Sequence, residues 1–311
     1  MTHTEPLAIL FNPSAGLGNA LARKDSLEEV LRLSGLVYEL TVTKSEAHLR
    51  ELTRQLATAG RAVAGAGGDS TFHIMANEIV GSGSEAPLGM IGTGSSNDIP
   101  LAFGLETMEK ACAALKAGRT KRVDLGVVRA EGRRLCYFLG QANVGLGVSV
   151  NRFVKDLATR RPGLGKRQLV AGLLGIRRAY RTREIPLRLR VKVDGREAAG
   201  EFTLAVFSNT PTWATGRLIN PDADPADGVL DSCLIGQMSL LRLARVAALA
   251  RRGAHGKKKG VCFLRSAAFE IEADEPFLIQ ADGEILGPPG SPEGFRRVRI
   301  EAVPRALPVF A

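Results

Sequence analysis

Paired glycines, an acid and two hydroxyls stand between a predicted strand and a predicted helix. A short apolar run at 61–64 indicates a buried strand. The run 72–80 indicates a helix, whose inward residues would be Ile74, Met75 and Ile79. Glycines allow a positive φ and the close approach of a ligand, and a helix N-terminus favours an anion. The segment therefore predicts a phosphate site. The alternative is an ordinary turn followed by a helix cap. Its members are Gly67, Gly68, Asp69, Ser70 and Thr71.

Two further segments show the same order of strand, small-residue loop and helix. The strand predicted at Leu7–Phe11 leads through a loop into a helix from about Asn19 to Ser34. The strand predicted at 87–91 leads through residues 92–100 into another helix. Because the loops after parallel strands meet at one edge of an open α/β sheet, we expect the three loops to lie together. The candidate ligand-binding residues of these two loops are Asn12, Ser14, Gly16, Gly94, Ser95, Asn97 and Asp98.

Composition and charge limit the classes of protein to consider. A chain of 311 residues with 45% apolar and 24% charged residues is long enough for two globular domains. Its net charge of +10 favours an anionic partner such as a nucleotide, a nucleic acid or an acidic membrane, with a solvated basic surface as the alternative. We expect no signal peptide and no bilayer-spanning run, so any membrane contact would be peripheral. Widely spaced cysteines indicate reduced thiols in the cytoplasm: Cys112, Cys136, Cys233 and Cys262.

The pattern changes after residue 124, where strands joined by turns replace alternating strands and helices. Strands are predicted at 136–140, 187–193 and 202–207. Asp194 and Gly195 signal a hairpin turn between the last two. Apolar and basic residues alternate along 187–193, which leaves one face for a core and the other for solvent. We therefore predict an antiparallel β-sandwich in this half of the chain.

A basic and partly apolar helical region at 151–183 interrupts these strands. An apolar stripe among many cations is typical of an interfacial helix drawn to anionic lipid. It is also typical of a helix that packs on its own sheet and leaves a charged face in water. The stripe is Leu169, Val170, Leu173, Leu174 and Tyr180, and the cations are Lys155, Arg160, Arg161, Lys166, Arg167, Arg177, Arg178, Arg181 and Arg183.

Two acidic segments of the second half carry further candidate residues. Residues 222–231 form an Asp-dense loop, which could bind a hard cation or be a simple turn. A strand at 277–281 delivers Asp282 and Glu284 across a tight turn at Gly283. An exposed hairpin is the alternative interpretation of this second segment.

The glycine-rich segment resembles the Gly-Gly-Asp-Gly-Thr motif of the diacylglycerol kinase-like superfamily, which contains bacterial lipid kinases, sphingosine kinases and, more distantly, NAD kinases. Ser70 and Ile74 depart from the pattern, because the family has Gly and Glu at these positions. Segments similar to further family motifs follow in the family's order from near residue 8 to the C-terminus. The resemblance implies an NAD kinase/diacylglycerol kinase-like α/β domain with an open sheet and flanking helices at 1–124, a mainly antiparallel β-sandwich domain at 125–296, and a tail at about 297–311 that returns to the first domain.

The resemblance also implies a reaction and roles for the candidate residues. The chain would use ATP and Mg²⁺ to phosphorylate a lipid hydroxyl, with Glu284 as general base and Asp282 in support. Asp69 and Asp98 would hold Mg²⁺ against the phosphates. A Cβ at Ser70 could narrow phosphate access, or strain the backbone if φ is positive there. ATP would contact Asn12, Ser14, Gly16, Thr43, Gly67, Gly68, Asp69, Ser70, Thr71, Gly94, Ser95, Asn97 and Asp98, and a structural Mg²⁺ would bind Asp224, Asp227 and the Val229 carbonyl.

The expected function is therefore an ATP-dependent kinase of diacylglycerol or a related lipid, in the cytoplasm and peripheral to the membrane. Three alternatives stay open: a related kinase with a soluble acceptor such as NAD or a polyol, a non-catalytic nucleotide-binding or membrane-associated regulator, and a nucleic-acid-binding protein. The aromatic content of 5% and the lack of a recognised nucleic-acid module argue against the last. The expected partners are a lipid substrate and an anionic membrane surface, without nucleic acid, and a homodimer stays open.

Overall fold

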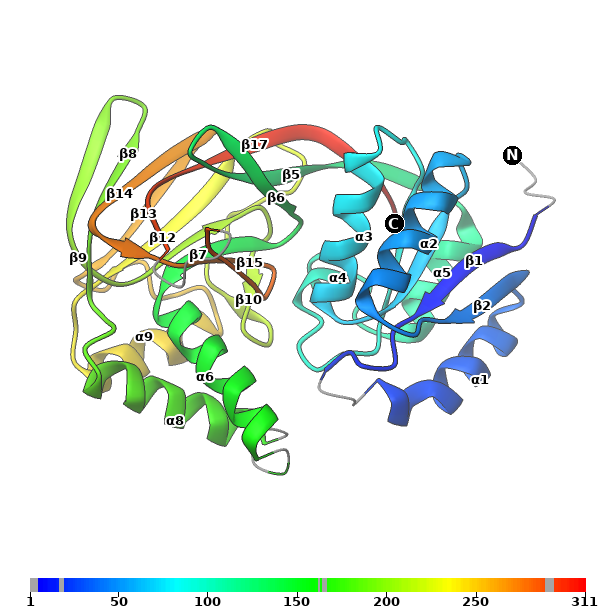
Figure 1. Cartoon of the computed structure of the whole chain (residues 1–311), viewed down its shortest axis with the longest axis horizontal. Coiled ribbons are helices and arrows are strands. Elements are labelled where there is room, and N and C mark those ends of the chain that lie inside the picture. Colours follow the sequence, from blue (N-terminus) through cyan, green and yellow to red (C-terminus); the bar gives the residue numbers. More distant parts are fainter. Residues whose placement is uncertain (1–4, 17–19, 162, 164–166, 289–293) are drawn as a thin grey trace.

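The chain forms two domains that lie side by side (Figure 1). The computed structural model describes residues 5–16, 20–161, 163, 167–288 and 294–311. Two residues named in the predictions lie outside these described residues: Asn19, the expected start of the first helix, and Lys166 of the basic region.

The N-terminal domain is built on four parallel strands in the order β2-β1-β3-β4. The central strand β3 is buried along its whole length, as expected for a strand with helices on both faces of its sheet. The helices are amphipathic, and Leu27 and Leu31 of α1 and Leu49 of α2 reach the core. The elements are β1 (Leu7–Phe11), η1 (Leu21–Arg23), α1 (Lys24–Ser34), β2 (Tyr38–Val42), α2 (Glu46–Thr58), β3 (Val63–Gly67), α3 (Asp69–Gly81), β4 (Leu88–Gly92), α4 (Asp98–Ala102) and α5 (Met108–Ala117).

Helix ends in this domain follow from local chemistry. The hydroxyls of Ser45 and Thr107 accept backbone hydrogen bonds at the starts of α2 and α5. Gly118 ends α5 in the left-handed conformation, as predicted. The first α-helix begins at Lys24 after a 3-10 turn, which is later than the predicted start. The inward side of α3 is confirmed, because its three predicted core residues are at most 5% exposed.

The C-terminal domain is the predicted antiparallel β-sandwich. The predicted alternation is found in β8, where Leu189, Val191 and Val193 are buried. Asp194 and Gly195 both have a positive φ, as their hairpin turn requires. Figure 1 shows α6, α8 and α9 together at one end of this domain. The elements are β5 (Thr120–Ala130), β6 (Arg133–Phe138), β7 (Gln141–Gly145), α6 (Leu146–Arg160), α8 (Gln168–Arg181), β8 (Leu187–Val193), β9 (Arg196–Ser208), β10 (Thr212–Trp213), β11 (Arg217–Leu218), β12 (Leu230–Gly236), α9 (Leu240–Ala250), β13 (Val261–Ser266), β14 (Ala268–Phe277), β15 (Ile279–Ala281), β16 (Glu284–Leu286) and β17 (Phe295–Phe310).

Two long strands, β5 and β17, run through both domains and join them (Figure 1). β17 pairs with β14 in the sandwich, and its far end pairs in parallel with β4, where Val309 lies opposite Leu88. Leu307 and Val309 therefore pack in the core of the first domain, whereas Val298 and Ile300 pack in the core of the second. The two cores are held by one continuous strand, which makes a rigid frame for residues on both sides of the junction.

The crowded side of β5 gives the first testable prediction. Gly126 pairs with Phe138, and a Cβ on Gly126 would overlap the Phe138 ring. We expect Gly126→Ala to lower the free energy of unfolding by about 1–3 kcal/mol or more, because overpacked cores must shift rings and backbone. The matched control is Gly200→Ala, where the nearest atom to a Cβ is 3.8 Å away and no strain is expected. Urea unfolding of both variants tests this, and equal stability of the two would contradict it.

Candidate active site

Three strand-to-helix loops meet at the carboxyl edge of the parallel sheet, as predicted. The Asn12 amide donates to Thr71 Oγ1 at 3.0 Å, which ties the β1 loop to the first turn of α3. The backbone N–H of Gly94 donates to the Gly67 carbonyl at 3.1 Å, which ties the β4 loop to the end of β3. The Ser95 hydroxyl donates to a carbonyl of the β1 loop at 3.2 Å. The three loops thus form one connected surface of small and hydroxyl residues.

Close backbone packing explains the glycines in these loops. Neither Gly67 nor Gly68 has a positive φ, so that part of the expectation was wrong. A Cβ on Gly67 would overlap the Thr71 side chain, and a Cβ on Gly94 would lie 2.6 Å from the Gly68 Cα. Among the described glycines of these loops, Gly16 alone needs a special backbone conformation, because its φ is +62°. The loops require small residues chiefly because they touch each other.

The remaining predicted nucleotide-contact residues occupy distinct positions on this surface. Ser70 lies in the first turn of α3 with helical backbone, so the anticipated strain does not arise. Asn97 has the left-handed conformation, and its amide bonds both the N–H and the carbonyl of Gly94. Ser14 is exposed on the β1 loop. Thr43 is buried, and its hydroxyl donates to a carbonyl of β1 at 3.1 Å. That hydroxyl therefore supports the strand end beside the loops.

Asp69 and Asp98 begin α3 and α4 and connect the two domains through backbone hydrogen bonds. Asp69 accepts from the N–H groups of Asp98 at 3.2 Å and Ile99 at 2.9 Å. Asp98 accepts from the N–H groups of Thr215 at 3.0 Å and Gly216 at 2.6 Å in the C-terminal domain. Burial, followed by the nearby charge of Asp98, raises the pKa of Asp69 to about 7, and burial also raises the pKa of Asp98. This pair of desolvated carboxylates has the charge pattern that a bound cation neutralises.

The raised pKa of Asp69 predicts a pH-dependent stability. A carboxyl with a raised folded-state pKa contributes stability that is fully present below its unfolded value near 4 and is lost as the pH rises through about 7. We expect the free energy of unfolding of the ligand-free chain to fall by about 4 kcal/mol over this range relative to Asp69→Asn. Urea unfolding across the pH range measures the difference. Parallel pH profiles of the two proteins would contradict the assignment.

Asp282 is a buried carboxylate in a two-residue hairpin turn between β15 and β16. Asp282 and Gly283 both have a positive φ, as an Asp-Gly hairpin turn requires. The carboxylate accepts from the three successive backbone N–H groups of residues 139–141, at 2.7, 2.9 and 3.0 Å. It also lies 3.2 Å from His73 Nδ1 on α3. With these four partners the carboxylate fixes the turn that carries Glu284, which is consistent with the predicted supporting role.

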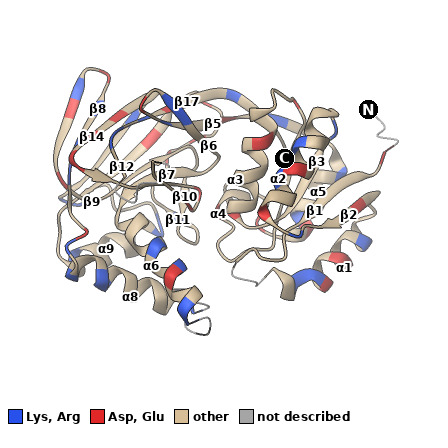
Figure 2. Cartoon of the chain, in the orientation of Figure 1, with Lys and Arg blue, Asp and Glu red and all other residues tan. Residues whose placement is uncertain are grey.

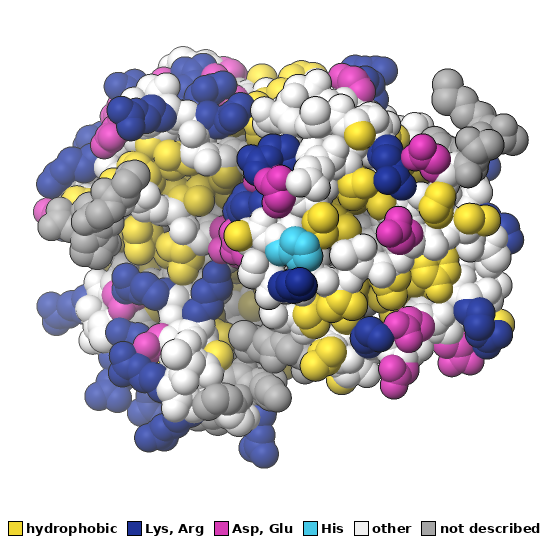
Figure 3. Space-filling view, turned by 45° about the vertical axis from the view of Figure 1, so that its right-hand side comes forward, with side chains coloured by type: hydrophobic (Ala, Val, Ile, Leu, Met, Phe, Trp, Pro, Cys, Tyr) yellow, Lys and Arg dark blue, Asp and Glu magenta, His cyan; other side chains and the backbone are white. Residues whose placement is uncertain are grey.

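Glu284 belongs to the C-terminal domain and faces the three loops that follow β1, β3 and β4 in the N-terminal domain. Its carboxylate lies 3.4 Å from Lys155 Nζ, and the Ser70 hydroxyl is near enough to favour its ionised form. Burial favours the neutral acid, but the Lys155 charge, the Ser70 hydroxyl and the nearby His73 outweigh it, so the pKa of Glu284 is lowered. Figure 3 shows a hollow between the two domains. Because Ser70 directly follows Asp69, Glu284 of the C-terminal domain lies near the start of α3.

Three residues around this turn were missed by sequence reasoning. His73 was taken only as part of a helix, and Lys155 only as part of a basic surface. Asn151, beside Lys155 on α6, donates to the Gly283 carbonyl at 2.8 Å and was not singled out. Their partners lie more than a hundred residues away along the chain, so no spacing in the sequence signals these contacts.

The acid-dense loop, which is the predicted structural cation site, is held by contacts within the protein. The Arg265 guanidinium binds the Asp227 carboxylate. Asp224 accepts a backbone N–H of its own loop at 3.0 Å, and the Val229 N–H donates to Asp227 at 3.1 Å. Within the part of the chain that the structure describes, no group of three or more His, Cys, Asp or Glu side chains could bind a metal ion. Arg265 thus supplies positive charge beside Asp227, and the binding of a structural Mg²⁺ by Asp224, Asp227 and the Val229 carbonyl stays a prediction.

Comparisons with known proteins agree with this arrangement along the whole chain. Residues 6–128 match the family described as diacylglycerol kinase catalytic domain, and residues 140–311 match the YegS C-terminal NAD kinase beta sandwich-like domain. A diacylglycerol kinase of Mycobacterium tuberculosis (strain ATCC 25618 / H37Rv) is 30% identical over 307 residues, which cover 97% of this chain and 93% of the relative. A diacylglycerol kinase of Bacillus subtilis (strain 168) is 25% identical over 293 residues, 90% of this chain and 89% of the relative.

The fold is shared with solved structures at lower identity. A crystal structure of a diacylglycerol kinase from Bacillus anthracis str. Sterne superposes with a TM-score of 0.69 and 16% identity, covering 100% of this chain and 98% of that chain. The match to the diacylglycerol kinase catalytic domain and the relatives of that name show a phosphotransferase that acts on an alcohol group. The chain belongs to the diacylglycerol kinase-like superfamily of lipid kinases.

Proposed function

We propose that the chain is an ATP-dependent kinase that phosphorylates a hydroxyl of diacylglycerol or a related lipid. The observation that carries this proposal is the contact between α3 and the turn that bears Glu284. His73 of α3 lies 3.2 Å from Asp282, which brings an ionised carboxylate close to the loops that follow β1, β3 and β4. A carboxylate beside a bound phosphate can accept the proton of an incoming alcohol. The names of the relatives support a lipid as the acceptor.

The connected loops support a triphosphate at the start of α3. The helix N-terminus favours an anion, and Gly67, Gly68 and Ser70 put only small residues beside it, while Thr71 ties the helix start to Asn12. Asp69 and Asp98 would hold Mg²⁺ there. A divalent cation would offset the cost of burying their negative charges, which is what raises their pKa values. When bound, Mg²⁺ would neutralise charge on the phosphates during transfer.

The proposed step is an in-line transfer between the domains. The lipid hydroxyl oxygen forms a bond to the γ-phosphorus of ATP, while the bond from that phosphorus to the bridging oxygen breaks and ADP leaves. Glu284 accepts the hydroxyl proton. Its lowered pKa keeps it ionised at neutral pH, and Lys155 helps to hold it so. Asp282 positions Glu284 through the hairpin turn that it anchors.

The basic helices support contact with an anionic membrane surface. Figure 2 shows Lys and Arg gathered on α6, α8 and α9 at one end of the C-terminal domain. On α8 the apolar residues Leu169 and Leu173 are 75% and 61% exposed, although they would be expected in a core if the helix merely packed on its sheet. Among the described residues, no helix has both the length and the apolar character to span a bilayer. A homodimer stays a prediction, which sedimentation velocity would check.

The test of this function is transfer of labelled phosphate from ATP to acceptors of different class. We expect product with diacylglycerol in vesicles, and little with soluble diols or NAD. Turnover confined to a soluble acceptor would favour the related kinase, and ATP binding without transfer to any acceptor would favour a regulator. Incubation with an extracted lipid pool, followed by identification of the labelled product, would assign the lipid.

A further inference from the structure

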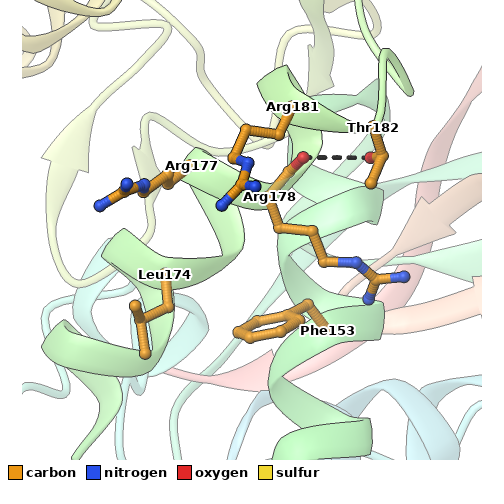
Figure 4. Close-up of a pocket in the computed structure, with 6 residues that line it drawn as sticks. All are labelled: Phe153, Leu174, Arg177, Arg178, Arg181 and Thr182. Carbon is orange, nitrogen blue, oxygen red and sulfur yellow. Dashed lines mark hydrogen bonds between the residues drawn. The ribbon is translucent and has the colours of Figure 1, made fainter.

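A groove of about 470 Å³ lies between α6 and α8, and none of its lining residues belongs to the candidate active site. Figure 4 shows Leu174 of α8 and Phe153 of α6 on one side of it, with the arginine side chains of α8 beyond them. The helices approach closely at this point because Gly175 faces α6, where a Cβ would lie 3.2 Å from Phe153 and 3.3 Å from Val150. The lining residues are Phe153, Leu174, Arg177, Arg178, Arg181 and Thr182.

The groove carries concentrated positive charge without a lining carboxylate. Arg178 lies over the Phe153 ring, 5.6 Å from its centroid, which restricts the orientation of the guanidinium. The nearest acid to Arg178, Glu184, is 3.9 Å away and lies closer to Arg152, at 3.2 Å. Arg177 and Arg181 form no ion pair with any described residue. The guanidinium groups of Arg177 and Arg181 are therefore available to an anionic ligand, and Arg178 beside them is only weakly paired.

An exposed apolar surface continues from these arginines along the same face of α8. Leu169 and Leu173 precede Arg177 and Arg181 at successive steps of four residues, which places all four on one face of the helix. Leu174, which is 40% exposed, reaches the groove itself. An apolar stretch followed by a cluster of cations is complementary to a ligand with an acyl chain at one end and an anionic headgroup at the other.

We propose that this groove is a headgroup site for a phosphomonoester lipid, distinct from the acceptor site between the domains. A phosphomonoester carries about −1.5 to −2 charges and three strong acceptor oxygens, and arginine forks bind such oxygens in pairs. A phosphodiester lipid has one negative charge and leaves part of the guanidinium cluster unneutralised. The site binds the headgroup through Arg177, Arg178 and Arg181, and the acyl chains lie over the leucines.

This inference rests on the proposed membrane association, but it does not depend on the proposed reaction for its test. If the reaction is as proposed, its product is itself a phosphomonoester lipid. The groove would then retain the enzyme on membranes where the product accumulates.

Vesicle flotation in the absence of ATP tests the proposal. Vesicles of phosphatidylcholine alone, with phosphatidic acid, and with phosphatidylglycerol at matched total charge are compared. We expect the chain to bind the phosphatidic acid vesicles about fivefold more tightly than the charge-matched phosphatidylglycerol vesicles. Because no transfer is measured, failure here leaves the proposed reaction standing, and absence of phosphate transfer leaves this site standing.

Lysine substitutions distinguish a specific headgroup site from non-specific electrostatic attraction to the membrane. The double variant R177K/R181K keeps the net charge but loses the planar fork, so we expect it to bind both anionic vesicles alike. The matched control is R133K/R196K, which changes two exposed arginines on strands of the sandwich and should keep the preference. A preference that survives R177K/R181K, a preference that both variants lose, or no binding of the parent chain to any vesicle would overturn the proposal.

Discussion

The Glu284→Gln variant is expected to transfer phosphate about 100- to 10,000-fold more slowly than the parent chain, which is the range that a general base contributes. The amide keeps a similar shape, but it cannot accept the proton of the acceptor hydroxyl. The affinity for ATP should change little, because Glu284 lies on the acceptor side of the hollow between the two domains. Single-turnover transfer and equilibrium ATP binding, measured on the same preparation, separate the two effects.

Two further observations belong to this experiment. The matched control is Glu275→Gln, which removes an exposed acid on β14 and should leave transfer unchanged. Because the pKa of Glu284 is lowered, protonation of this base should limit activity only as the pH falls below the usual range of a glutamate. If Glu284→Gln retained parental transfer, another group would have to act as the base.

The Asp69→Asn variant is expected to lose about 100-fold or more in transfer, because it removes the charge that would hold the cation against the phosphates. An asparagine also has one carbonyl oxygen, whereas the two oxygens of Asp69 accept from Asp98 and Ile99. We therefore expect a higher Mg²⁺ concentration at half-maximal rate, which a simple loss of folding would not produce. Mg²⁺ titration of the transfer rate measures this.

The control for that variant is another acid at the start of a helix in the same domain. Asp25 stands in the first turn of α1 and is exposed, so Asp25→Asn should leave the rate and the Mg²⁺ dependence unchanged. Equal effects of the two substitutions would mean that Asp69 acts only through its general charge. An unchanged rate in Asp69→Asn would instead favour a non-catalytic role for the nucleotide loops.

The parts of the site that the sequence revealed are those built from neighbouring residues. Strand, small-residue loop and helix follow each other within a few positions, so three loops and their common edge could be predicted. The reason for the glycines at 67 and 68 could not, because it depends on contacts between Gly67 and Thr71 and between Gly68 and Gly94. The predicted domain limit after residue 124 stays a prediction, since β5 passes through it without a break.

The parts that the sequence concealed depend on partners far apart in the chain. The sequence indicated only that Lys155 belongs to a basic surface. Its contact with Glu284, which is 129 residues away in the chain, could not be predicted. The contact of Asp227 with Arg265, which is 38 residues away, could not be predicted either. Ser70 looked like a defect in the motif, yet it is helical and lies near Glu284. A residue type suggests a role, but its partner in three dimensions decides it.

The most direct measurement is a crystal structure of the chain with a non-hydrolysable ATP analogue and Mg²⁺. The account predicts the triphosphate on the loops after β1, β3 and β4, with its last phosphate at the start of α3 and turned toward Glu284. Asp69 and Asp98 should face the cation. A nucleotide bound elsewhere, or one whose last phosphate points away from Glu284 with no room for an alcohol between them, would contradict it.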